Sequence, residues 1–108
     1  MTPERQHYRL AYPATLRPRL TLTDGREFVV LDLSESGLRF APAGGTFVSG
    51  EEMAGTVRFR SGRVFPVSGR VLRAAPTDCA LRLESGIPFQ LMVEEQRALL
   101  QTGRWLAS

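Results

Sequence analysis

Turn-forming residues interrupt most of this chain at intervals of 8 to 19 residues, which leaves room only for short strands between them. The segments between the turns alternate apolar and polar side chains, as strands do when one face is buried. The turns are predicted at Asp24-Gly25, Ser34–Gly37, Pro42–Gly45, Ser61-Gly62 and Pro76–Asp78. Many short strands in one small domain favour a barrel, because closure removes exposed sheet edges.

The fold class that follows is mainly β, a six-stranded antiparallel barrel of split or Greek-key type with a C-terminal helix. The strands are predicted over residues 14–22, 26–33, 37–40, 52–60, 63–73 and 79–84. We expect a single domain over residues 1–108, with a flexible N-terminal arm at 1–13, the barrel at 14–84 and the helix at 88–103.

The helix is predicted from a change in hydrophobic period after Pro88, from two residues to about 3.6. Gly103 is a plausible stop. Glu94 and Glu95 fall on the opposite, solvated side of the predicted helix. The apolar stripe consists of Phe89, Met92, Val93, Gln96, Leu99 and Leu100.

The composition argues against most catalytic chemistry. The 108 residues include one cysteine, Cys79, and one histidine, His7, which are too few for a zinc site of the usual type. No apolar run approaches the ~18 residues of a membrane span, and the first residues lack the apolar stretch of a signal peptide. We therefore expect a cytoplasmic protein without catalytic residues, metal, cofactor or membrane span.

Positive charge is the more informative part of the composition. All 14 basic residues are arginine, and the net charge is +3. The excess lies near the N-terminus, where Arg5 and Arg9 sit in the predicted arm. Arginine presents a planar fork that binds phosphate through two hydrogen bonds and stacks on flat rings.

Two short motifs stand out against this background. Residues 5–9 read R-x-x-x-R, and residues 32–37 read D-x-S-x-x-G at the end of the second predicted strand. The first motif is common by chance in an arginine-rich chain, whereas the second is rare. In this order and position, with a predicted barrel and a final helix, the two motifs resemble the PilZ domain, a bacterial receptor module for cyclic di-GMP.

The resemblance implies a ligand and a set of residues that hold it. Arg5 and Arg9 would hold phosphates and guanine edges, while Asp32, Ser34 and Gly37 would receive a guanine. Arg39 shares a face with Gly37 and is expected to add a contact. Gly37 is also expected to supply a positive φ or to let the ligand approach the backbone. Glu4 precedes the motif where many family members have a further arginine, so binding of one ligand or a stacked pair stays open.

The same residues have simpler interpretations. Arg5 and Arg9 could be a solvated arm, and Asp32 and Ser34 could serve only to cap a turn. One alternative function is a PilZ-like adaptor in pilus or motility machinery that binds no ligand. A less favoured one is a small nucleic-acid-binding barrel, for which the outward-facing arginines are Arg17, Arg19, Arg58, Arg60, Arg70 and Arg82.

The leading hypothesis is a receptor for cyclic di-GMP. It would pass the signal to an unidentified protein partner. It is expected to be a monomer or a weak dimer and to bind no nucleic acid.

Overall fold

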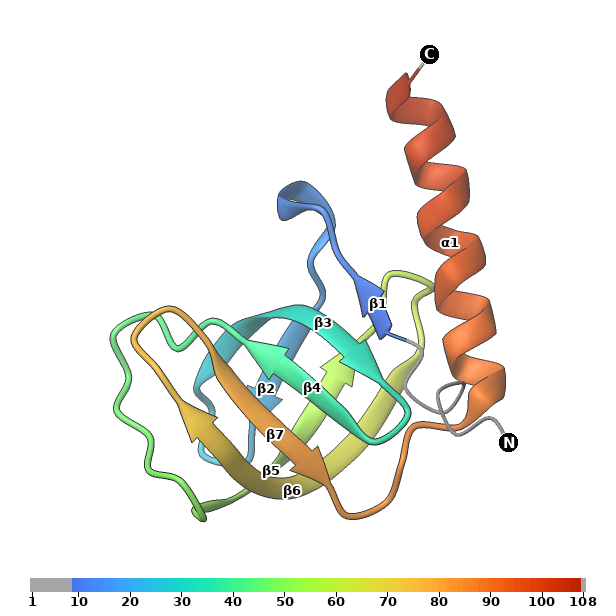
Figure 1. The fold of residues 1–108 in the computed structure, drawn as a ribbon. Coiled ribbons are helices and arrows are strands. Elements are labelled where there is room, and N and C mark those ends of the chain that lie inside the picture. Colours follow the sequence, from blue (N-terminus) through green and yellow to red (C-terminus); the bar gives the residue numbers. More distant parts are fainter. Residues whose placement is uncertain (1–8, 108) are drawn as a thin grey trace, which may run out of the picture.

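Six antiparallel strands close into a ring in which each strand pairs with two neighbours (Figure 1). This computed structural model describes the backbone of residues 9–107 and the side chains of residues 9–101. It confirms the predicted mainly β barrel with one C-terminal helix. The order around the ring is β2 (Arg19–Leu22), β5 (Glu52–Arg58), β6 (Val64–Ala74), β7 (Cys79–Leu83), β4 (Gly37–Phe40) and β3 (Glu27–Ser34).

A seventh strand, β1 (Arg9–Ala11), lies outside the ring and pairs only with the second half of β3. The first half of the same β3 edge is taken by β2. The chain between β1 and β2 turns outward through a 3-10 helix, Ala14–Leu16, where the sequence analysis expects a strand. That prediction is wrong because Leu16 is buried in a helical turn, closed by the N–H of Leu16 bonding to Pro13 O at 2.9 Å.

The barrel interior is filled by inward-facing apolar side chains from all six ring strands. Three phenylalanine rings, Phe28, Phe40 and Phe47, pack against one another with centroids 5.3–5.5 Å apart. The side chains with no exposed surface that face this interior include Leu20, Val30, Leu33, Phe40 and Val57. Their alternation along the strands agrees with the period of two in the sequence.

Helix α1 (Phe89–Ala107) runs beside the barrel, and its C-terminal half extends away from it (Figure 1). The helix continues past Gly103, the stop that the sequence favours. No helix within residues 9–107 is long and apolar enough to cross a bilayer.

The helix turns only part of the predicted stripe to the barrel: Met92 is buried and Leu99 packs against the core. Leu91, Met92 and Glu95 are buried, whereas Phe89 and Leu100 of the predicted stripe are 66% and 58% exposed. Glu95, expected on the solvated side, has no exposed surface. That expectation is wrong because groups outside the helix hydrogen-bond the Glu95 carboxylate and so allow its burial.

Three donors from the barrel hold the Glu95 carboxylate. The Tyr12 hydroxyl donates to Oε2 at 2.6 Å, and the backbone N–H groups of Arg60 and Ser61 donate at 2.8 and 2.9 Å. A buried carboxylate is tolerated only when its oxygens are paired in this way. Glu95 therefore ties α1 both to the segment after β1 and to the turn between β5 and β6.

Replacing Glu95 by glutamine should destabilise the protein by about 1–3 kcal/mol, because the amide has one acceptor oxygen where the carboxylate has two. Glu94→Gln is the matched control, since Glu94 forms an exposed pair with Arg63 at 3.0 Å. It should change stability by less than about 0.5 kcal/mol. Urea denaturation of both variants measures the difference, and equal effects would contradict the role given to Glu95.

Alkaline pH should reduce the stability that the contact between Tyr12 and Glu95 contributes. Burial, together with the neighbouring Glu95 carboxylate, raises the pKa of Tyr12 above its ordinary value. A raised pKa in the folded state means that the contribution is complete below pH ~10 and is lost as the pH rises further. Stability should therefore fall more steeply above pH ~10 in the wild type than in Tyr12→Phe, as followed by denaturation at several pH values.

Candidate ligand-binding site

One extra residue in β3 places the second motif on the outside of the barrel. The pairing of β3 with β4 shifts between Val30 and Asp32, so Leu31 forms a β-bulge. Phe28 and Val30 face the core before the bulge, and Leu33 faces it afterwards. Asp32 and Ser34 consequently lie on the outer face, where β1 and β4 flank them.

Asp32 is the centre of this outer face. Its side chain is only 3% exposed, and both carboxylate oxygens are bound by arginine. Arg9 Nη1 donates to Oδ1 at 2.7 Å, while Arg39 donates to Oδ2 through Nε at 2.7 Å and Nη2 at 2.6 Å. The hydrogen bond to Asp32 is the main cause that raises the pKa of Arg39, so this guanidinium stays charged. Arginines from β1 and β4 thus neutralise one buried carboxylate on β3.

A second carboxylate, that of Asp78, also binds the Arg39 guanidinium. Asp78 Oδ2 accepts from Arg39 Nη1 at 2.9 Å and from Arg73 Nη2 at 3.0 Å. The hydrogen bond from Arg39, more than that from Arg73, holds the pKa of Asp78 below its ordinary value. The five side chains Arg9, Asp32, Arg39, Asp78 and Arg73 therefore form a continuous array of alternating charge, which we call the ion-pair array.

The serine and glycine of the second motif have local structural roles. The Ser34 hydroxyl donates to the carbonyl of Gly37 at 3.4 Å, a long bond across the β3–β4 turn. Gly37 does not take a positive φ, so that part of the expectation is wrong. A Cβ at Gly37 would lie 2.7 Å from the Leu81 carbonyl of β7, which explains the glycine.

The structure therefore brings together Arg9, Asp32 and Arg39 by direct contact, with Ser34 next to them on β3. Gly37 lies at the start of β4, where it pairs with Arg82 of β7. Arg5 lies outside the described residues. The ligand-binding role of each of these residues stays a prediction.

Two members of the ion-pair array, Arg73 and Asp78, were missed by the sequence analysis. A signal for Arg73 does exist in the sequence. Val67 and Val71 face the core on β6, and the alternation would place Arg73 on the same face. A charged residue at a position where the pattern calls for an apolar one indicates a bulge, and the same reasoning applies to Asp32 after Val30.

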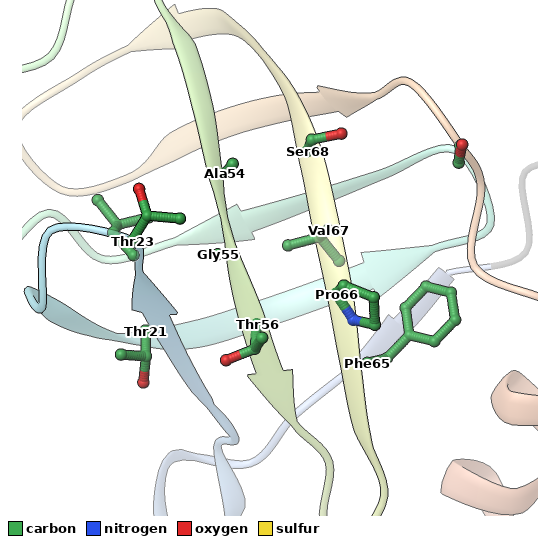
Figure 2. A pocket seen from close by; sticks show the side chains of 11 residues that line it. Thr21, Thr23, Ala54, Gly55, Thr56, Phe65, Pro66, Val67 and Ser68 are labelled. Atoms are coloured by element: carbon green, nitrogen blue, oxygen red, sulfur yellow. The ribbon is translucent and has the colours of Figure 1, made fainter.

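A hollow elsewhere on the barrel differs in character from the ion-pair array. It has a volume of about 680 Å³ and lies over β2, β5 and β6 (Figure 2). Its lining is apolar or uncharged, with Thr21 and Thr23 from β2 and the following turn, and Phe65 and Pro66 from β6. Because it offers no arginine, it cannot neutralise a phosphate.

The ion-pair array thus lies on the outer wall of a small closed barrel. The sequence model described as "PilZ domain" matches residues 3–103 of the chain. The chain therefore belongs to the PilZ domain family. No curated protein sequence matches the chain.

Solved structures with the same fold include three proteins of low sequence identity. An uncharacterized Legionella protein aligns with a TM-score of 0.53 at 12% identity, covering 94% of this chain and 96% of that one. The Bacillus subtilis inhibitor of motility, MotI/DgrA, aligns with a TM-score of 0.60 at 16% identity, covering 93% of this chain and 52% of that one. The chain thus spans about half the length of that protein.

A third similar structure is the PilZ domain of CeSA from a cellulose-synthesizing bacterium. It has a TM-score of 0.51 at 20% identity, with 89% of this chain and 98% of that one covered. At these identities the three likenesses establish the fold.

Arg39→Ala should lower the free energy of unfolding by about 1–3 kcal/mol, because Asp32 stays buried with one arginine fewer. The matched control is Arg70→Ala, which removes an exposed arginine paired with Glu52 at 2.8 Å. That change should cost less than about 1 kcal/mol. Thermal or urea denaturation distinguishes the two, and an equally small loss for Arg39→Ala would mean that water replaces its contacts.

Proposed function

We propose that this PilZ domain is a bacterial receptor for cyclic di-GMP, which changes conformation on binding and signals to a partner protein. One observation carries the proposal. Arg9 of the first motif contacts Asp32 of the second at 2.7 Å on the outer face of the barrel, although the two are far apart in the chain. The contact, together with membership of the family, supports a single site assembled from both motifs.

The chemistry of the contact fits a guanine nucleotide. The N1–H and N2–H groups of guanine are adjacent donors, arranged much like the fork of a guanidinium, and a carboxylate accepts both. A guanine could therefore replace an arginine at Asp32. The released Arg9 could then donate to a phosphate or to guanine O6 and N7. Arg5 is expected to join from its place four residues earlier.

The free protein already holds the acceptor in position. Asp32 is buried and both of its oxygens point to donors, so little reorganisation of the carboxylate is required when a guanine replaces a guanidinium. Ser34 lies beside it on β3, where its hydroxyl could reach a ribose, a phosphate or a base edge.

Arg9 and Tyr12 are close in the sequence, so a change at the binding site would be transmitted to Tyr12. Arg9 begins β1, and Tyr12 directly follows that strand and donates to Glu95 of α1 at 2.6 Å. A ligand that displaces Arg9 from Asp32 would shift β1 and so alter this contact. The position of α1 on the barrel is then the surface change that a partner protein would detect.

The alternatives lead to different expectations. An adaptor without ligand would keep the Arg9–Asp32 pair as a purely structural contact. A nucleic-acid-binding barrel needs free positive charge, yet Arg19 and Arg70 of the outward arginines are paired with Glu27 and Glu52. Binding rather than catalysis, a cytoplasmic location and a monomer or weak dimer remain predictions.

Calorimetric titration of the purified protein with cyclic di-GMP tests the proposal, with GTP and cyclic di-AMP as controls. We expect saturable binding that is selective for cyclic di-GMP, and the stoichiometry will distinguish one ligand from a stacked pair. Absence of heat and of any shift in melting temperature at high ligand concentration would contradict the proposal and favour the adaptor.

Arg9→Ala should weaken cyclic di-GMP binding by about tenfold or more, because it removes a charged fork from the site. Ser34→Ala should weaken it less, since one hydroxyl is lost. Arg19→Ala is the matched control, an exposed arginine on β2 whose partner is Glu27. Calorimetry should find its affinity close to wild type, and Arg9→Ala behaving like this control would exclude the role given to Arg9.

A further inference from the structure

The ion-pair array contains the same arrangement twice. Asp32 bridges Arg9 and Arg39, and Asp78 bridges Arg39 and Arg73, so each carboxylate lies between two guanidiniums. The four ion pairs measure between 2.6 and 3.0 Å. Only the first half of the array contains residues of the two sequence motifs.

A second β-bulge brings Arg73 to this surface. The pairing of β6 with β7 shifts between Val71 and Arg73, so Leu72 is the extra residue. Val71 faces the core, and without the bulge Arg73 would face it too. Ala80 of β7 pairs with Arg39 on one side and with Arg73 on the other, so a short side chain lies between the two arginines in the sheet.

The three arginines differ in how many donors they have left. Arg39 uses three of its five N–H groups on the two aspartates, through Nε, Nη1 and Nη2. Within the described part of the chain, the Arg73 side chain bonds only to Asp78, through Nη2, and it is 56% exposed. Arg73 therefore presents N–H groups toward solvent from a guanidinium that Asp78 holds in place.

We propose that Arg73 is a further ligand-contacting residue, which binds a phosphate of the cyclic dinucleotide on the β6 side of the site. The inference rests on the proposed function and extends it beyond both motifs. Arg9 and Arg73 then form the two outer positions for anionic oxygen, with Arg39 fixed between them. The array carries three positive and two negative charges, so it has one unneutralised charge to offer to a ligand.

The test compares Arg73→Ala with Arg58→Ala by calorimetric titration with cyclic di-GMP. Arg58 is exposed on β5, a strand that pairs with neither β3 nor β4. Replacing it by alanine removes the same charge as Arg73→Ala, but outside the ion-pair array. We expect Arg73→Ala to weaken binding by about two- to fivefold, the effect of losing one partly exposed ion pair, and Arg58→Ala to match wild type.

The salt dependence of binding provides a readout that a purely structural role would leave unchanged. Affinity should fall less steeply with added salt in Arg73→Ala than in wild type, because one charge–phosphate contact is missing. Arg73→Lys should retain most of the salt dependence and part of the affinity. Arg73→Gln serves as a second neutral variant if the alanine variant does not fold.

Two negative outcomes are separable. If the wild type binds and the Arg73 variants match Arg58→Ala in affinity and salt dependence, the inference on Arg73 is overturned and the proposed function stands. If the wild-type protein does not bind cyclic di-GMP, both are overturned.

Discussion

A single additional residue in β3, Leu31, decides which side of the barrel wall the charged side chains occupy. Without it, Asp32 would follow Phe28 and Val30 into an apolar interior, where an unpaired carboxylate costs several kcal/mol. Leu72 has the same effect on β6 and keeps Arg73 out of the core. The two bulges place both charges on the outer face, and every ion pair of the array depends on this placement.

Much of the fold could be predicted because its strands alternate regularly. Residues 79–84 alternate without interruption, and Cys79, Leu81 and Leu83 of β7 are all buried. The bulges are indicated only by Asp32 and Arg73, charged residues where the alternation calls for apolar ones, because a one-residue shift leaves the rest of the pattern almost unchanged. The start of β2 was misplaced for a related reason: Leu16 fits an alternating pattern, but it is buried by a helical turn.

The candidate site was predictable where residues are close in sequence and hidden where they are not. Asp32 and Ser34 are two residues apart on one strand, so their common face follows from strand geometry. Arg73 and Asp78 reach Arg39 only because β4, β7 and β6 are neighbours in the ring, which no local pattern reveals. Glu95 was misassigned because its hydrogen-bonding partners come from two segments that are distant in the sequence.

Among the strands of residues 9–107, β1 alone pairs with a single neighbour. Each ring strand is held on both edges, so it cannot separate without opening the barrel, whereas β1 can leave β3 with the ring intact. The protein can therefore exchange its first strand between docked and released states while its core stays folded. Its backbone amides should divide accordingly into a slowly exchanging barrel and a first strand that opens independently, at the cost of exposing Leu10 and of separating Tyr12 from Glu95.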